Sequence, residues 1–356
     1  MNSINEKKNE NMLYVSFNQD GSFFVVGTDR GFRIYNTYPF EKIYQKDMDQ
    51  EIIMIEMLYK TNILAFMEGD LEHNNEKKII IWDDMEEKII SELRFITKVL
   101  RIKIKKDFLF ILCRTLIFVF DFNTFELLEK IETGENEHEL IAVNSSQEYT
   151  VLAYPKKDKD MINNTISVKN YKTKTIFAFH AQEDSVTYLS MNSSGTYIAT
   201  SNKNGTIIRI HSGIDGYLLK EFKRGSEKAI INYICFDNDS KFMAVCSDKG
   251  TIHIFSMGST MKEFNDHQKR KGGGGKDIEE DEDKLPQNPQ NYIEKIIYPE
   301  LERSFAKVRL EPQDCICAFG PNDILVILTN ENKYYNAKIN TKKSGDCQII
   351  FEKDLI

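Results

Sequence analysis

Short apolar runs separated by polar turns recur along the whole chain. Most of these runs are four to seven residues long, are rich in Ile, Val, Phe and Tyr, and are bounded by Gly, Asn or Asp. Apolar runs of this length between turn residues favour strands over helices. We therefore predict an all-β protein with very little helix.

One strand–turn–strand frame occurs three times. In each copy a turn residue comes just before an apolar strand, and a second turn residue follows ten positions after the first. The three pairs of turn residues are Gly21 and Gly31, Gly195 and Gly205, and Ser240 and Gly250. The last two copies are offset by 45 residues. A repeat of about 40 to 45 residues with four short strands is typical of a propeller blade.

Weaker copies of this pattern fill the rest of the chain. The predicted strands lie at 79–82 and 88–93, 116–120 and 125–130, 165–169 and 175–179, and 314–319, 324–328, 334–339 and 348–351. Without an insert at 257–300, the chain keeps 312 residues, and seven blades need about 315. We predict a single domain over residues 1–356, a seven-bladed β-propeller of four-stranded antiparallel blades.

Two segments depart from the strand pattern. Residues 68–78 are acidic and rich in Asn, which predicts a surface loop in the second blade. Residues 257–300 contain three consecutive basic residues, four consecutive glycines and an acidic block. That composition is typical of a flexible insert, which we place in the sixth blade.

Composition and charge exclude several classes of protein. The chain is 41% hydrophobic and 29% charged, as folded soluble domains are. No apolar run is long enough to cross a bilayer and the first eleven residues are polar, so we expect a cytosolic protein. The net charge of −8 argues against a nucleic-acid partner, and any anionic partner has to meet a local basic patch.

The common catalytic and metal-binding motifs are absent from the sequence. The sequence contains no Gly-Lys-Ser/Thr phosphate loop, no G-x-G-x-x-G, no H-E-x-x-H and no G-x-S-x-G. Six cysteines lie mostly inside apolar runs and form no Cys-x-x-Cys pair, at positions 113, 235, 246, 315, 317 and 347. We expect reduced thiols, no metal, no cofactor, and a binding protein rather than an enzyme.

The segment Phe222-Lys223-Arg224-Gly225 places two cations side by side between two strand-like runs. Neighbouring residues of an extended chain point to opposite faces, so this short segment can serve two anion sites. Downstream, Ser247, Thr251 and His253 offer two hydroxyls and an imidazole, which suit phosphate oxygens. The alternative is a solvated turn with ordinary polar strand ends.

This segment resembles the Phe-Arg-Arg-Gly motif of the PROPPIN family, β-propellers that bind phosphoinositides. Ser247-Asp-Lys-Gly-Thr-Ile-His-Ile-Phe255 and Cys315-Ile-Cys-Ala-Phe-Gly320 also resemble that family. The match is close over residues 186–255 and returns near Cys315. Lys223 departs from the first arginine of the motif, and lysine lacks the planar fork that grips a phosphate with two hydrogen bonds.

The resemblance implies two phosphoinositide pockets. The sixth-blade pocket maps onto Arg224, Ser247, Thr251 and His253, and the fifth-blade pocket onto Lys223, His180, Asn202, Thr206 and Arg209. Asn202 stands where the family usually has serine. The resemblance also implies that the long sixth-blade loop contacts the membrane, whereas its composition alone is equally consistent with a passive loop.

The function implied by the resemblance is the binding of phosphatidylinositol 3-phosphate and phosphatidylinositol 3,5-bisphosphate. A monomer would be recruited to the cytosolic side of autophagic, endosomal or vacuolar membranes, and would bring an autophagy lipid-transfer protein or other autophagy machinery there. The alternative is a WD-type scaffold that binds only proteins.

Overall fold

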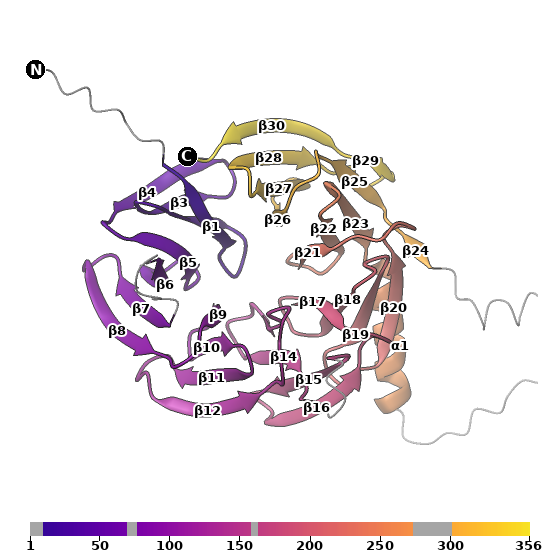
Figure 1. Cartoon of the computed structure of the whole chain (residues 1–356). Helices are drawn as coiled ribbons and strands as arrows, with labels where there is room; N and C mark the ends of the chain where they lie inside the picture. Colours follow the sequence, from indigo (N-terminus) through magenta and orange to yellow (C-terminus); the bar gives the residue numbers. More distant parts are fainter. Residues whose placement is uncertain (1–9, 70–76, 158–162, 273–300) are drawn as a thin grey trace, which may run out of the picture.

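Seven β-sheets stand around a common centre like the blades of a propeller (Figure 1). The computed structural model describes residues 10–69, 77–157, 163–272 and 301–356. Within each sheet the consecutive strands pair antiparallel. The predicted seven-bladed, almost entirely β architecture is therefore confirmed.

The first three blades are simple four-stranded meanders. Blade one contains β1 (Met12–Phe17), β2 (Phe23–Thr28), β3 (Gly31–Asn36) and β4 (Glu41–Asp47). Blade two contains β5 (Glu51–Met57), β6 (Ile63–Gly69), β7 (Lys78–Asp83) and β8 (Lys88–Arg94). Blade three contains β9 (Val99–Ile104), β10 (Phe108–Cys113), β11 (Leu116–Asp121) and β12 (Leu127–Glu132).

The next two blades continue the ring. Blade four contains β13 (Ala142–Val143), β14 (Val151–Pro155), β15 (Thr165–Asn170) and β16 (Thr175–His180). Blade five contains β17 (Val186–Met191), β18 (Tyr197–Asn202), β19 (Ile207–Ser212) and β20 (Leu218–Lys223), and the short strand β24 (Glu302–Arg303) pairs parallel to β20.

Blades six and seven complete it. Blade six contains β21 (Ile231–Phe236), β22 (Phe242–Ser247), β23 (Thr251–Ser256) and β25 (Ala306–Arg309), with β29 (Gly345–Asp346) parallel to β25. Blade seven contains β26 (Cys315–Gly320), β27 (Ile324–Thr329), β28 (Lys333–Lys338) and β30 (Gln348–Asp354). The insert lies between the third and fourth strands of blade six.

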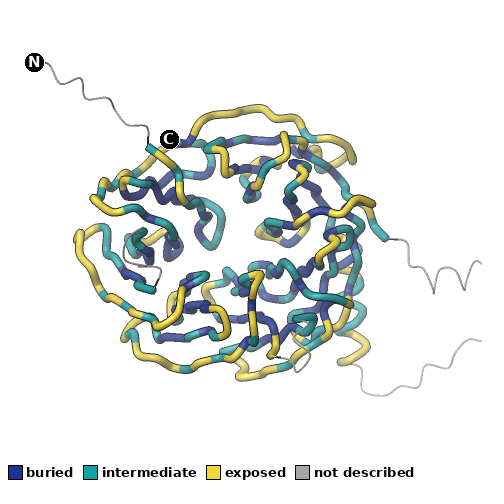
Figure 2. Tube along the Cα trace, viewed as in Figure 1, coloured by how far each residue is buried: buried dark blue, intermediate teal, exposed yellow. Residues whose placement is uncertain are grey.

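The hydrophobic core is divided among the junctions between blades. Among the described residues, each of the seven pairs of neighbouring blades encloses its own cluster of buried side chains. Because successive side chains of a strand point to opposite faces, one strand contributes to two junctions. On β22, Val245 packs toward blade five, and its neighbours Ala244 and Cys246 pack toward blade seven. Figure 2 shows the resulting gradient from buried inner strands to exposed outer strands such as β8 and β12.

The ring closes between blades one and seven through side chains. All four strands of blade seven lie within residues 315–354, so closure here does not use a strand from blade one. Instead the Phe24 ring of blade one stacks on the Tyr334 ring of blade seven at 6.2 Å, and the Tyr334 hydroxyl donates to the Thr37 carbonyl at 2.7 Å. The Tyr35 hydroxyl donates to the Leu355 carbonyl near the other end of the chain.

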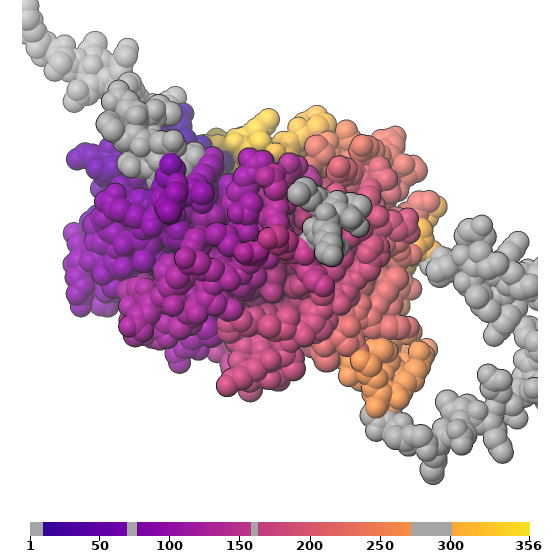
Figure 3. All heavy atoms as spheres, turned by 60° about the horizontal axis from the view of Figure 1, so that its bottom comes forward, coloured from indigo at the N-terminus to yellow at the C-terminus, as the bar shows by residue number. Residues whose placement is uncertain are grey.

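The first part of the insert forms a helix, which corrects the prediction of a flexible segment over the whole of 257–300. Helix α1 (Gly258–Gly272) lies against β20 at the edge of the ring (Figures 1 and 3). Met257 is fully buried and Phe264 packs edge-on against Tyr197 at 5.5 Å, so these two side chains bind the helix to blade five. His267 stacks on Tyr217 at 4.0 Å.

The remaining parts of both predicted loops, residues 273–300 and 70–76, lie outside the described residues. In the part of the chain that the structure describes, no helix is long and apolar enough to cross a membrane.

Gly205 illustrates why the repeat frame needs glycine at its second position. Its φ of +58° is one that residues with side chains rarely adopt, and a Cβ there would lie 2.1 Å from the carbonyl oxygen of Ala229. By contrast, a Cβ on Gly225 would meet no atom within 4 Å.

We predict that Gly205→Ala lowers the free energy of unfolding by about 1 kcal/mol or more, because alanine is strained at positive φ and its Cβ collides with the Ala229 carbonyl in the connection to blade six. Gly225→Ala is the matched control and is expected to leave stability nearly unchanged. Urea unfolding followed by circular dichroism measures both, and equal stabilities of the two variants would contradict the account of this turn.

Candidate anion-binding site

The two adjacent cations point to different junctions of the ring. Phe222, the residue before Lys223, is opposite Ile208 and packs into the core between blades five and six. The alternate positions Glu221 and Lys223 therefore lie on the other face of the sheet, toward blade four. Arg224 follows Lys223 and again faces blade six, where its charge acts on His253. One short segment thus contributes to two faces.

Blade six gathers its candidate residues on the face toward blade five. His253 is opposite Val245, which belongs to the core between these two blades. Thr251 lies two residues earlier on β23, on the same face. Across the next ladder, Thr251 is opposite Arg309 and His253 is opposite Lys307. The fold therefore brings Lys307 and Arg309 to this face.

The electrostatics of this face suit an anion. Burial, and then the positive charges of Lys307, Arg224 and Arg309, lower the pKa of His253 to about 3. Three positive charges thus act on one neutral, buried imidazole, whose Nδ1 lies 3.3 Å from the Ser304 hydroxyl. The Ser247 hydroxyl is buried without a hydrogen-bond partner among the described residues.

Arg224 also holds the local backbone together. Its side chain is only 6% exposed, its Nε donates to the Gly205 carbonyl at 2.6 Å, and one Nη donates to the Glu227 carbonyl. Its backbone N–H donates to the Thr206 carbonyl at 2.8 Å. Because a guanidinium has five N–H groups, three remain for a ligand. Arg224 is therefore both an anchor of the Gly205 turn and a candidate ligand.

The candidate residues of the fifth-blade pocket already bond to other groups of the protein in two cases, Arg209 and Asn202. Arg209 donates from Nε to Glu221 at 2.6 Å and from Nη to Glu183 at 3.1 Å. The Asn202 side chain accepts the backbone N–H groups of Asn204 and Gly205. Asn202 thus builds the hairpin turn, and two carboxylates neutralise the charge of Arg209.

The buried histidine of this face is His211, which the sequence analysis missed. His180 is exposed at the end of β16, whereas His211 is 3% exposed and its ring packs at a tilt against Phe179, with 4.6 Å between the ring centroids. Burial, then the charges of Arg209 and His180, lower the pKa of His211 to about 3. The signal available in the sequence was that His211 lies two residues after Arg209 on one strand, so that both side chains point to the same face.

Corresponding positions in the two blades differ in sign. The third residue of β19 is Arg209, opposite Glu221, and the third residue of β23 is His253, opposite Lys307. An acidic residue therefore stands in blade five where a basic residue stands in blade six. Lys307 therefore adds a positive charge to the blade-six face, where Arg309 is itself paired with Asp346 at 3.2 Å. Lys307 and Arg309 alternate with apolar residues in 306–309, which is a recognisable strand pattern, but their partner strand is not readable from the sequence.

Fold and site together define a seven-bladed β-propeller with a basic face on blade six and a second, partly neutralised basic face on blade five. The chain belongs to the PROPPIN family, whose model matches residues 11–356.

Individual relatives are similar to this chain in sequence, and solved structures are similar to it in fold. The chain is 27% identical to autophagy-related protein 18 of Dictyostelium discoideum over 99% of this chain and 96% of that protein. A structure of Kluyveromyces lactis Hsv2 with complete loop 6CD superposes with a TM-score of 0.76 at 24% identity, covering 98% of this chain and all of that one. A chain in the complex of KlAtg21 with the coiled coil of AgAtg16 superposes with a TM-score of 0.75 at 20% identity, covering 97% of this chain and all of that one.

The lowered pKa of His253 has a consequence for stability. Between pH 6.5, the ordinary pKa of a histidine, and about 3, the unfolded chain takes up a proton at residue 253 that the folded chain does not. The contribution of His253 is therefore complete above about pH 6.5 and is lost as the pH falls toward 3. We predict that His253→Gln flattens the decline of the unfolding free energy between pH 7.5 and pH 5.

Urea unfolding at the two pH values measures this slope. His138→Gln is the matched control, because it makes the same substitution at an exposed histidine in the connection between blades three and four. Parallel slopes for His253→Gln and the parent would show that His253 is protonated as easily in the folded protein as in the unfolded chain.

Proposed function

We propose that this protein binds phosphoinositides and is recruited by them to membranes. The ligands would be phosphatidylinositol 3-phosphate and phosphatidylinositol 3,5-bisphosphate, and the blade-six face would be the stronger of two sites. The observation that carries the proposal is the convergence of Arg224, Lys307 and Arg309 on one face, around the neutral imidazole of His253.

The chemistry of a phosphate monoester fits this face. Such a group carries a charge of about −1.5 to −2 near neutral pH and offers several acceptor oxygens. The basic side chains would neutralise the charge, and the Ser247 and Thr251 hydroxyls with the His253 imidazole would complete the hydrogen bonding. Lys223 on the blade-five face would hold a second headgroup, so that one rigid edge engages one membrane twice and gains avidity.

The family and the curated relatives support a role in autophagy. In this role the protein binds rather than catalyses, as a peripheral protein of autophagic, endosomal or vacuolar membranes. It would act as a monomer and recruit an autophagy lipid-transfer protein or other autophagy machinery. The complex of KlAtg21 with a coiled coil shows that a propeller of the same fold engages a protein partner. A scaffold that binds only proteins is the alternative, and vesicle flotation separates the two.

We predict that the double substitution Lys307→Gln with Arg309→Gln lowers the affinity for vesicles containing phosphatidylinositol 3-phosphate by at least about tenfold, as measured by flotation. Each charge-assisted hydrogen bond lost costs roughly 1.5 to 3 kcal/mol. The substitutions leave the Arg224 anchor in place, so a loss of binding cannot be attributed to an unfolded turn.

Lys241→Gln is the control, since it removes a positive charge from the opposite end of blade six. Vesicles of phosphatidylcholine alone give the background. If the double variant floats as well as Lys241→Gln, the blade-six face is not the binding site. If the parent floats equally with both kinds of vesicle, or with neither, phosphoinositide recognition itself is wrong.

The two sites are predicted to be unequal. Calorimetric titration with a soluble bisphosphorylated inositol headgroup should resolve two classes of site in the parent, because blade five offers lysine and a neutralised Arg209. Arg224→Ala should cost more affinity than Lys223→Ala, and Lys223→Arg should strengthen the weaker site.

The double variant Lys223→Ala with Arg224→Ala should lose both sites. Urea unfolding identifies any variant in which the Gly205 turn has been damaged. A larger loss from Lys223→Ala than from a folded Arg224→Ala would reverse the proposed order of the two faces.

A further inference from the structure

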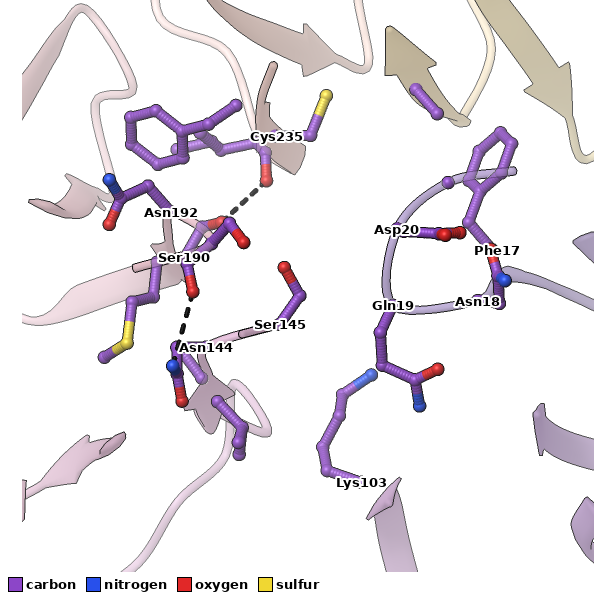
Figure 4. Close-up of a pocket in the computed structure, with 18 of the residues that line it drawn as sticks. Phe17, Asn18, Gln19, Asp20, Lys103, Asn144, Ser145, Ser190, Asn192 and Cys235 are labelled. Carbon is purple, nitrogen blue, oxygen red and sulfur yellow. Dashed lines mark hydrogen bonds between the residues drawn. The ribbon is translucent and has the colours of Figure 1, made fainter. Parts of the chain in front are cut away.

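The centre of the ring contains a polar cavity that the proposed lipid sites do not use. Its volume is about 240 Å³, and its lining includes residues from the innermost strand of each of the seven blades. Figure 4 shows Cys235, Ser190 and Asn144 on one wall, and Gln19 and Lys103 on the other. Small polar molecules that enter the ring can therefore reach Cys235.

Four cysteines meet beside this cavity, at the junction of blades six and seven. They are Cys235 on β21, Cys246 on β22, and Cys315 and Cys317 on β26. The Cys317 Sγ lies 3.5 Å from the Cys235 Sγ and 3.4 Å from the Cys246 Sγ. Cys317 is thus in contact with two other thiols, although 82 residues separate it from Cys235 along the chain.

The surroundings distinguish Cys317 chemically from its neighbours. Hydrogen bonds from Cys235 and then Cys246 lower the pKa of the Cys317 thiol, because they stabilise its thiolate. The same contact with Cys317 and burial raise the pKa of Cys235, which stays protonated. The thiolate is the reactive form of cysteine, and the contacts of Cys317 with two other thiols favour it as the nucleophile of the cluster.

Exposure to the cavity favours Cys235 over Cys246 as the partner of Cys317. Cys235 and Cys317 both line the cavity, and Cys235 is partly exposed. Cys246 is fully buried and is not part of the lining. Cys317 lines the cavity but is itself only 1% exposed, so a reagent meets it beside the partly exposed Cys235, with Cys246 behind them.

We propose that Cys317 and Cys235 form an oxidisable dithiol site whose substrate is a small hydroperoxide such as hydrogen peroxide. The Cys317 thiolate attacks one peroxide oxygen, the O–O bond breaks, and the hydroxide that leaves takes up a proton from solvent as water. The sulfur of Cys235 then attacks the sulfenic acid at Cys317, the S–O bond breaks, and a second water leaves with the thiol proton.

The balance of this reaction is two thiols oxidised to one disulfide and one peroxide reduced to two waters. Bond formation requires the two sulfurs to approach from 3.5 Å to about 2.05 Å. The disulfide would join the innermost strands of blades six and seven. It would thereby fix the junction next to the blade that carries the stronger anion-binding face.

The test uses the full-length protein, freed of reductant and treated with hydrogen peroxide. We expect the count of free thiols to fall from six to four, as two are consumed, and to recover with dithiothreitol. Peptide mapping by mass spectrometry after alkylation is expected to identify a peptide that joins Cys235 to Cys317. Because this measurement needs no variant, it does not depend on whether a substituted protein folds.

Variants then assign the roles. Cys317→Ser and Cys235→Ser should each abolish the disulfide, whereas Cys246→Ser should retain it. Cys347→Ser is the matched control: Cys347 is partly exposed but outside the cluster, and burial raises the pKa of its thiol to about 11. Oxidation of Cys347 before Cys317, a bond from Cys317 to Cys246, or an unchanged thiol count would each overturn the proposal.

Discussion

Each blade of this protein is a sheet with two apolar faces, and both faces have to be buried. A row of such sheets always leaves two faces open to water, whereas a closed ring leaves none. The junction of blades one and seven removes those last two faces, through Phe24, Tyr35 and Tyr334. Every other junction depends on this closure, because the geometry of the ring fixes the angle at which each blade meets the next.

The candidate sites follow from this arrangement. Because neighbouring residues on a strand point to opposite faces, Lys223 and Arg224 reach two junctions from one segment. A rigid ring then holds the two basic faces at a fixed separation, which is what the proposed binding of one membrane by both faces would require. The difference between them comes from single residues on the outer strands, Glu221 in blade five and Lys307 in blade six.

The insert and the thiol cluster depend on the same junctions. Helix α1 is stable because Phe264 and the buried Met257 extend the core between blades five and six. The four cysteines meet because blades six and seven each direct small side chains into their shared junction near the centre. Polarizable sulfur packs there as a small hydrophobic group, and its reactivity depends on the contacts that the junction imposes.

The sequence by itself determined the class of fold, the number of blades and the positions of most strands, because strand alternation and turn residues are local properties that a repeat reveals. It also placed Arg224, Ser247, Thr251 and His253 in one candidate site, through local motifs. Only the tertiary structure decided that Lys307 and Arg309 join this site, that Glu221 and Glu183 neutralise Arg209, and that Cys235 contacts Cys317. These pairings join distant segments or opposite sheet partners, and their register is set by the packing of blades rather than by any pattern within one strand.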